Sequence, residues 1–243
     1  MQLTEAQFKR DGFALVTDLL DLNSRTELRR LTPQILIAAE HWRQRSEPLW
    51  FLQDDIPYLA PLLLQDRLIQ RIQNQCGLQN KSLELLAVTL YRKIAGEPGT
   101  AWHQDARYIP VDDLAAFTLW LPLQPIDKTN GPIKFIPGSQ HQCLFEQPQP
   151  ADQSLRGMAH RSACTAEPMN FGDGTVHNPW TMHSSCRNHT DSPRLALIVN
   201  YITEPLQLSK EVVLKGQLHT PVINALRQTN HHTLGQHLQR TQK

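Results

Sequence analysis

The sequence predicts a mainly β fold in which a sandwich or barrel of short strands is supported by N-terminal helices. Two observations lead to this fold class. Helical patterns are concentrated in about the first eighty residues, and from about Leu83 short apolar runs alternate with turns that contain Gly or Pro. Helices followed by a series of short strands are typical of such sandwiches and barrels. A barrel can enclose a small ligand, so candidate site residues are expected on the strands.

The N-terminal segment is expected to contain two capped helices. Thr4 and Gln7 form a capping box, and Gly12 is placed to end the helix that they begin. Ser24 and Glu27 form a second capping box, which predicts the start of a longer amphipathic helix.

That second helix is expected to run towards Ala39, with a kink at Pro33, because proline removes a backbone hydrogen bond. Asp66 can cap a further short helix that ends at Gly77. The intervening stretch from His41 to Pro61 is aromatic and typical of irregular structure.

The strands of the predicted core are apolar or alternating runs bounded by turn residues. The polar stretch from Gln142 to Pro168 is predicted to be a long surface loop. The predicted strands are FALV (13–16), LELLAVTLYRKI (83–94), AAFTLWLPL (115–123), IKFIP (133–137), MNFGDGTV (169–176), a segment around WTMHSS (180–185) and RLALIVNYI (194–202).

All 243 residues are expected to form a single domain. It would consist of a helical part over about residues 1–80, a strand-rich core over about 83–203, and a C-terminal helix and tail over 205–243, with the helix from Glu211 to Arg227.

Composition and charge disfavour several classes of protein. The formal net charge is +1, so no overall field attracts nucleic acid or an anionic membrane. No apolar stretch approaches about 18 residues, and the N-terminus lacks the pattern of a signal peptide. The cysteines fit no zinc or disulfide pattern; they are Cys76, Cys143, Cys164 and Cys186. We therefore expect a cytoplasmic protein that acts on a small molecule, without a membrane span or a nucleic-acid partner. The oligomeric state stays open.

The motif His-x-Asp occurs twice, as His103-Gln104-Asp105 and as His189-Thr190-Asp191. The first follows a predicted strand and a Gly-rich turn. Its two outer side chains can project together from a rigid edge, because alternate residues of an extended segment point the same way. The second lies in a polar run that is typical of a solvated loop. The first motif is therefore the preferred candidate for metal binding.

Two histidines and one carboxylate on one face of a metal leave three coordination positions open, and this facial triad is the signature of non-haem Fe(II) oxygenases. The third ligand has to come from a distant strand. His183, about eighty residues after His103 and on a segment with strand character, is the preferred third ligand. His177 is the alternative, although it lacks the Ser-x-x-x-Asn sequence that follows His183.

Several blocks of the sequence, in this order, resemble the phytanoyl-CoA dioxygenase family. The blocks are LTEAQFKRDGFALVTDLL (3–20), WHQDARYIP (102–110), LWLPL (119–123), TNGPIKFIPGSQH (129–141), FGDG (171–174) and MHSSCRNHTDSPR (182–194). The match extends from about Leu3 to Tyr201. It implies a double-stranded β-helix, the cupin-like jelly-roll barrel, buttressed by N-terminal helices. It also implies Fe(II) and O2, with 2-oxoglutarate as the co-substrate.

The resemblance further implies roles for individual residues. The metal ligands of the family correspond to His103, Asp105 and His183. The arginine that pairs with the far carboxylate of 2-oxoglutarate corresponds to Arg194. Three further residues are implied at the co-substrate site, namely Ser185, Trp120 and Tyr91.

Physical reasoning about Arg194 agrees with its implied role. The residues that share one face of its apolar strand are Arg194, Ala196, Ile198 and Asn200. A charge on an inward face needs a partner, and the guanidinium fork binds a carboxylate through two hydrogen bonds. Many 2-oxoglutarate enzymes carry a hydroxyl two residues after the arginine, where this chain has Ala196, and Ser185 can substitute for it.

By the resemblance, the expected reaction is hydroxylation of an unactivated C–H bond of a small organic molecule, with succinate and CO2 as co-products. The same metal centre can serve desaturation, cyclisation or epimerisation of a natural-product intermediate. Halogenation is disfavoured, because a halide needs the position of Asp105. An alternative of another class is a metal-free jelly-roll binding module, which would have no need of the three ligands together with Arg194.

Overall fold

A computed structural model of the chain describes residues 5–44, 50–107, 116–142 and 163–204. The strands among them are β1 (Phe13–Val16), β2 (Ser82–Lys93), β3 (Ala116–Pro122), β4 (Ile133–Phe135), β5 (Cys164–Thr165), β6 (Gly174–His177), β7 (His183–Ser185) and β8 (Arg194–Glu204). The helices are α1 (Glu5–Asp11), α2 (Leu22–Arg43), α3 (Leu52–Asp55), α4 (Leu59–Leu63) and α5 (Asp66–Cys76), with 3-10 turns η1 (Asp105–Arg107) and η2 (Ser139–His141).

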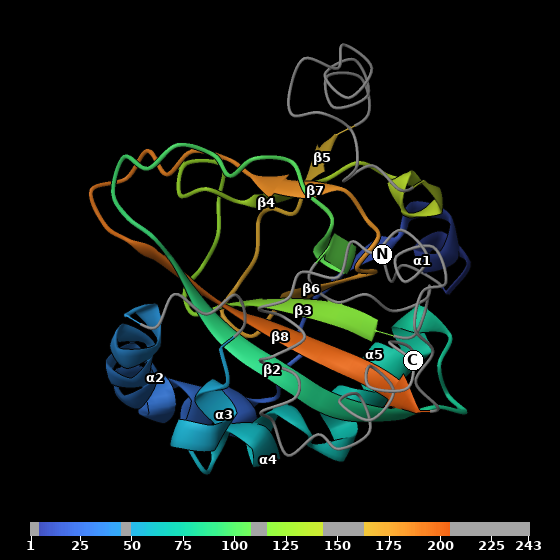
Figure 1. The fold of residues 1–243 in the computed structure, drawn as a ribbon, viewed down its shortest axis with the longest axis horizontal. Helices are drawn as coiled ribbons and strands as arrows, with labels where there is room; N and C mark the ends of the chain where they lie inside the picture. The colour runs from blue at the N-terminus through green and yellow to red at the C-terminus, as the bar shows by residue number, and fades with distance from the viewer. Residues whose placement is uncertain (1–4, 45–49, 108–115, 143–162, 205–243) are drawn as a thin grey trace, which may run out of the picture.

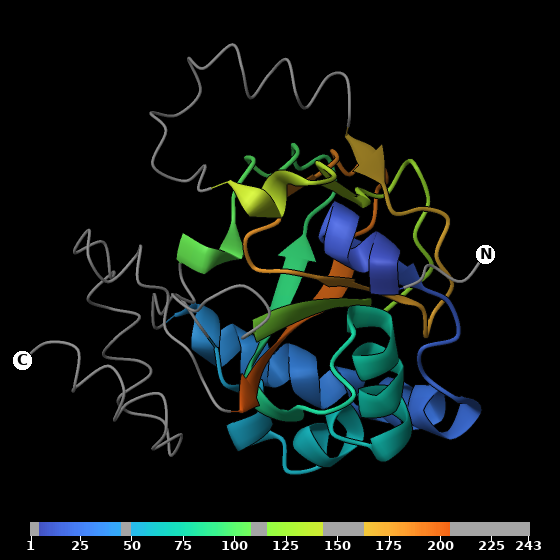
Figure 2. The ribbon, with the colours of Figure 1, turned by 90° about the vertical axis from the view of Figure 1, so that its right-hand side faces the viewer.

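Two antiparallel sheets lie one above the other. The large sheet has the strand order β1-β6-β3-β8-β2, and the small sheet has the order β5-β4-β7. Figure 1 shows the small sheet above the large one, and Figure 2 shows helices covering the opposite face of the large sheet. This is the double-stranded β-helix with N-terminal helical support, so the predicted fold class is confirmed. Within the described residues the two sheets stay separate and do not close into one hydrogen-bonded barrel.

Strand alternation divides the interior into two apolar layers. Phe117 and Leu119 of β3 belong to the layer between the large sheet and the helices. Trp120 of β3, with Ile133 and Phe135 of β4, belongs to the layer between the two sheets. Because successive side chains of a strand point to opposite faces, the same strands that pack on the helices also present residues to the space between the sheets.

The first helix and the strand after it agree with the sequence. Gly12 ends α1 in the left-handed conformation (φ 81°), and its N–H donates to the carbonyl of Phe8 at 2.7 Å. Thr4, the other half of the predicted capping box, lies outside the described residues.

The predicted caps of the later helices are wrong by one to three residues. Asp21 caps α2, because its carboxylate accepts the N–H of Ser24 at 2.8 Å. The hydroxyl of Ser24 instead donates to Gln65. The helix continues through Pro33 to Arg43.

Gln65, not Asp66, occupies the N-cap position of α5. The helix ends at Gly77, as predicted, with φ 73°. The stretch between α2 and α5, predicted to be irregular, contains α3 and α4. Helices of one turn are too short to show a periodic pattern in the sequence.

Several of the predicted strands are shorter in the structure, and the two before β6 and β7 lose their first residues to turns. Residues 170–173 form a turn in which Asp173 accepts the N–H of Asn170 at 2.6 Å, so β6 begins only at Gly174. The side chain of Asn178 accepts the N–H of Trp180, which makes a second turn before β7. Within the predicted loop from Gln142 to Pro168, β5 is a short strand, and residues 143–162 lie outside the described part. The predicted C-terminal helix also lies outside it.

Candidate metal and co-substrate site

The two candidate histidine ligands are joined through their backbones. The N–H of His103 donates to the carbonyl of His183 at 3.0 Å, and the N–H of His183 donates to the carbonyl of His103 at 2.9 Å. Between His103 and Asp105, Gln104 points away from the cavity: it is buried and donates to the carbonyl of Trp180. This pairing turns His103 and Asp105 towards the distant strand that carries His183.

The three predicted ligands form a compact group. One donor atom from each of His103, Asp105 and His183 lies within 4.8 Å of the others. Oδ1 of Asp105 is 3.8 Å from Nε2 of His103 and 3.4 Å from Nε2 of His183. Each Nδ1 faces a carbonyl at 2.9 Å, that of Ala101 for His103 and that of Thr181 for His183. A ring that donates through Nδ1 leaves the lone pair of Nε2 free for a metal.

Burial and neighbouring charges favour the metal-binding protonation states of Asp105 and His183. Burial alone would raise the pKa of Asp105, but the neighbouring His183, His177 and His103 rings outweigh it and hold that pKa well below its usual range. Burial, with the nearby His103 ring, lowers the pKa of His183. An ionised carboxylate and neutral imidazoles are the forms that bind divalent metals.

The second oxygen of Asp105 faces a different set of side chains. Oδ2 accepts a hydrogen bond from the hydroxyl of Thr118 at 2.7 Å. It also lies 3.4 Å from Nε2 of His177. His177 is wholly buried, and it is not a member of the compact donor group found among the described residues. His183 belongs to the three-residue donor group and His177 does not, so His183 stays the preferred third ligand and His177 the alternative.

Arg194 is a buried cation with unused hydrogen-bond donors. It is 1% exposed, and its Nε and Nη1 have no hydrogen-bond partner in the parts of the chain that the structure describes. The guanidinium carbon lies 5.2 Å from the ring centre of Tyr91 and 5.1 Å from that of Trp120. Burial lowers the pKa of Arg194 to about 10, so the side chain keeps its charge at neutral pH. A buried arginine with free donors fits a ligand carboxylate.

Glu97, the acidic residue near Arg194, interacts with Tyr91 and Lys93. The hydroxyl of Tyr91 donates to Oε1 of Glu97 at 3.2 Å, and Nζ of Lys93 lies 4.0 Å from the same oxygen. Burial, then the charge of Glu97, raises the pKa of Tyr91 to about 12, so its hydroxyl stays protonated. Lys93, the strand partner of Arg194, donates to the carbonyl of Pro98.

Ser185 lies in the cavity but has a local partner. Its hydroxyl lies 3.0 Å from that of Thr100, and its N–H donates to the Thr100 hydroxyl at 2.8 Å. The chain passes close by: a Cβ on Gly99 would lie 2.5 Å from the carbonyl oxygen of Ser185. Ala196 is fully buried in the apolar layer between the sheets.

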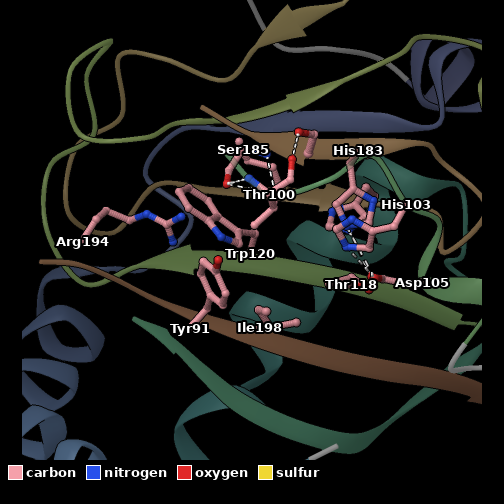
Figure 3. Close-up of a pocket in the computed structure, with 13 residues that line it drawn as sticks. Tyr91, Thr100, His103, Asp105, Thr118, Trp120, His183, Ser185, Arg194 and Ile198 are labelled. Carbon is pink, nitrogen blue, oxygen red and sulfur yellow. Dashed lines mark hydrogen bonds and ion pairs between the residues drawn. The ribbon is translucent and has the colours of Figure 1, made fainter. Parts of the chain in front are cut away.

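All seven site residues predicted from the sequence line one cavity of about 110 Å³. In Figure 3 the histidines and Asp105 lie at one end, Arg194 points inward from the other, and Trp120 and Tyr91 lie between them. Ile198, which the sequence placed on the same face as Arg194, also lines the cavity, and the sequence missed Thr100, Thr118, Ile133 and Ser184. Alternation on β3 could have indicated Thr118, whereas the local sequence carries no signal for Thr100.

The second His-x-Asp motif lies away from this cavity. His189 and Asp191 are exposed. Between them and the site, Asn188 is buried and donates to the carbonyls of Lys93, Ile94 and Ser192. The motif therefore lies in an exposed loop whose shape is held by the hydrogen bonds of Asn188.

The residues present fit both a divalent metal and a dicarboxylate co-substrate. Two imidazole nitrogens and one carboxylate oxygen are the donor set of a non-haem iron centre with open positions. Arg194 supplies the unpaired cation for a far carboxylate. Among the described residues, no helix is long and apolar enough to cross a membrane.

Comparison with known proteins places the chain in a family. The sequence profile named phytanoyl-CoA dioxygenase (PhyH) matches residues 8–196. No curated protein matches the chain in sequence.

Solved structures with the same fold include the epimerase SnoN in complex with Fe3+, alpha ketoglutarate and nogalamycin RO, at 21% identity and a TM-score of 0.69, covering 94% of this chain and 89% of that one. The carbocyclase SnoK from nogalamycin biosynthesis has 17% identity and a TM-score of 0.64, covering 89% and 90%. EctD from S. alaskensis with 2-oxoglutarate and 5-hydroxyectoine has 22% identity and a TM-score of 0.64, covering 82% and 74%. These likenesses concern the fold.

Proposed function

The chain belongs to the phytanoyl-CoA dioxygenase family of iron- and 2-oxoglutarate-dependent oxygenases, and on this basis we propose that it hydroxylates an unactivated C–H bond of a small organic molecule. The balanced reaction consumes the substrate, 2-oxoglutarate and O2, and it yields the alcohol, succinate and CO2. We also propose that this happens in a reducing compartment such as the cytoplasm, which the free thiols of Cys76, Cys164 and Cys186 support.

One observation carries the proposal. The buried guanidinium of Arg194, whose Nε and Nη1 have no hydrogen-bond partner among the described residues, opens into the same cavity as the His103–Asp105–His183 group. A metal-free binding module would have no use for a three-ligand group and an uncompensated buried cation facing one small space. A dicarboxylate held between a metal and an arginine accounts for both.

Each side chain has a defined task in this proposal. His103, Asp105 and His183 hold the metal, and their carbonyl and hydroxyl partners fix the directions of the three donor atoms. When bound, iron with 2-oxoglutarate and O2 supplies the oxidising power that replaces a C–H bond by a C–OH bond.

The remaining lining residues orient the co-substrate and exclude water. Arg194 binds the far carboxylate through its fork. Trp120, which is 4% exposed, and Tyr91 lie against the guanidinium, so they limit its movement and its contact with water. The hydroxyls of Ser185 and Thr100 offer further hydrogen bonds at the edge of the cavity.

The test is turnover of the purified protein with Fe(II), 2-oxoglutarate and pools of small organic molecules in air. We expect succinate release that depends on iron and 2-oxoglutarate and that one pool accelerates. Asp105→Ala should lose this release, whereas the exposed Arg92→Ala on β2 should keep it. The proposal would be contradicted if the wild-type protein formed no succinate with any of the pools.

Product mass separates hydroxylation from the other outcomes of the same centre. Hydroxylation adds one oxygen atom to the substrate. Desaturation or cyclisation removes two hydrogen atoms, and epimerisation leaves the mass unchanged. A product without added oxygen would retain the oxygenase assignment and overturn hydroxylation.

A further inference from the structure

A row of polar side chains crosses the large sheet below Asp105. In the antiparallel ladders Thr118 of β3 is the Cα partner of both His177 on β6 and Asn200 on β8. All three residues are buried: His177 is 0% exposed, Thr118 2% and Asn200 3%. The next residues along the row are apolar, Phe13 on β1 and Ala87 on β2. Buried polar groups among apolar neighbours are costly unless they are hydrogen-bonded, so the row needs partners.

Hydrogen bonds connect this row to a single oxygen atom. An ionised carboxylate accepts only, so the Thr118 hydroxyl must donate its one hydrogen to Oδ2 of Asp105, at 2.7 Å. The lone pairs of that hydroxyl then accept the amide N–H of Asn200, at 3.1 Å. The direction of the whole chain of hydrogen bonds is therefore set by the charge of Asp105.

His177 approaches the same oxygen from the other side. Its Nε2 lies 3.4 Å from Oδ2, and neither ring nitrogen makes a hydrogen bond within the described residues. The ring is held between Phe135 and His183, with ring centres at 5.2 Å and 4.5 Å. A buried imidazole without a partner is unfavourable, and Oδ2 is the acceptor that its Nε2–H can reach.

The two oxygens of Asp105 thus have separate surroundings. Oδ1 faces the Nε2 atoms of His103 and His183, whereas Oδ2 faces Thr118 and His177. A carboxylate can bind a metal through one oxygen or through both. Binding through both would fill one of the three positions that a facial triad leaves open.

We propose that the row His177–Thr118–Asn200 positions Asp105 so that it binds the metal through Oδ1 alone. This inference rests on the proposed function, because it requires Asp105 to be a metal ligand. The hydrogen bond from Thr118, with the Nε2 of His177 at 3.4 Å on the other side, would hold Oδ2 in the sheet and keep it out of the coordination sphere. His177 is a positioning residue in this arrangement, and the third open position stays available for the co-substrate and O2.

The test measures how the carboxylate binds the metal, apart from turnover. Infrared spectra of Zn(II)-loaded protein with isotope-labelled aspartate report the separation of the two carboxylate stretches, which narrows when both oxygens bind. Anaerobic titrations give the affinities for Fe(II) and for 2-oxoglutarate. Thr118→Val removes the hydroxyl at nearly constant shape, and His177→Phe removes the other donor.

In Thr118→Val, and more so in the double variant with His177→Phe, we expect the separation of the stretches to narrow. The affinity for 2-oxoglutarate should fall about tenfold or more, which is the effect of one hydrogen bond to a charged group. The affinity for Fe(II) should stay the same or rise, since the second oxygen adds a bond. A variant that merely damaged the structure of the site would instead have a lower affinity for Fe(II). Thr118→Ser should restore the wild-type values.

Thr175→Val is the matched control. Thr175 is also buried on β6, but its hydroxyl has no partner among the described residues, so its loss should change none of these readouts. The inference would be overturned if Thr118→Val and His177→Phe both kept the wild-type carboxylate stretches and 2-oxoglutarate affinity while Asp105→Ala still weakened metal binding. If Asp105→Ala binds Fe(II) as tightly as wild type, Asp105 is not a metal ligand, and both the proposed metal site and this inference are wrong.

Discussion

His183 owes its orientation to one carbonyl. Its Nδ1 lies 2.9 Å from the carbonyl oxygen of Thr181, which directs Nε2 towards Asp105. Because loss of an outer-sphere partner of a metal ligand typically costs about 10–100-fold in metal affinity, loss of the ligand itself should exceed about 100-fold. His183→Ala should therefore bind Fe(II) poorly in an anaerobic titration.

Two other histidines serve as comparisons for this substitution. His189→Ala alters the exposed motif and should leave the Fe(II) affinity unchanged. His177→Ala should retain most of that affinity, because His177 approaches Asp105 at Oδ2 and not at Oδ1, the oxygen that faces His103 and His183. If His183→Ala kept its Fe(II) affinity and His177→Ala lost it, His177 and not His183 would be the third metal ligand.

In the proposed metal site, Asp105 would occupy one coordination position that a residue without a carboxylate would leave open. Asp105→Gly should still bind iron and 2-oxoglutarate, though more weakly, and it should admit chloride at the vacated position. Anaerobic absorption spectra with and without chloride test this. A variant that binds iron and 2-oxoglutarate but whose spectra ignore chloride would show that the carboxylate does not occupy a metal position.

At the scale of single residues, the sequence was most informative where the signal is local. His103 and Asp105 belong to one short motif, so their proximity follows from strand geometry. His177 and His183 could not be ranked by geometry alone, because their difference depends on which of them pairs with His103 across the fold. Thr118 and Asn200 reach Asp105 only through the register of neighbouring strands, which no local pattern encodes.

The turn between α1 and β1 supports the element that carries the distal histidine. The carbonyl of Gly12 accepts the N–H of Asn178 at 2.8 Å and the hydroxyl of Thr181 at 2.7 Å. Gly12 has φ 81°, and a Cβ there would lie 2.3 Å from Oγ1 of Thr181. No side chain fits without moving the segment that precedes His183.

Gly12→Ala should therefore destabilise the protein more than Gly96→Ala does. Both glycines have positive φ, so each Ala costs about 1–2 kcal/mol of unfolding free energy from the backbone. At Gly96 no atom of the described residues lies within 4 Å of the new Cβ, whereas at Gly12 overpacking adds about 1–3 kcal/mol. Urea unfolding measures the two variants, and equal losses would show that the turn has room to relax.

At the scale of elements, agreement with the sequence follows the strength of the local pattern. β2, β3 and β8 have long apolar or alternating runs, and they lie where the sequence predicts them. The predicted caps at Ser24 and Asp66 were misplaced, because Asp21 and Gln65 lie close by and tertiary contacts decide between neighbours. The short β6 and β7 are bounded by side-chain turns whose partners are set by the final fold.

At the scale of the whole molecule, the site joins both sheets, so occupying it should stabilise the entire fold. Ligands that bind only the folded state at about 100 times their Kd add about 2.7 kcal/mol. At about 2–4 °C per kcal/mol for a chain of this size, the Tm should rise by about 5–11 °C. Anaerobic thermal unfolding with Fe(II) and 2-oxoglutarate measures the rise. Asp105→Ala should show little of it, and a similar rise in that variant would place the binding elsewhere.

The whole architecture was predictable because helices followed by short strands leave few folds, and because the motif blocks keep the order of one family. The pairing of strands across the two sheets was not predictable from alternation alone. That pairing brings β3, β6, β7 and β8 around one cavity. The close approach of Arg194 to Tyr91 and Trp120 depends on it as well.

In the proposed site, a buried arginine and a three-ligand metal group bind the two ends of one co-substrate. The most direct measurement is an anaerobic titration of 2-oxoglutarate into the Fe(II)-loaded protein, with Arg194→Ala, Arg194→Lys and the control Arg92→Ala. Removing one partner of a buried charge pair costs about 3–5 kcal/mol, so Arg194→Ala should lose about 10²–10³-fold or more in 2-oxoglutarate affinity. Arg194→Lys keeps the charge but lacks the guanidinium fork, so its 2-oxoglutarate affinity should lie between those of wild type and Arg194→Ala. Iron affinity should stay near wild type in all of them, and an unchanged 2-oxoglutarate affinity in Arg194→Ala would contradict the account.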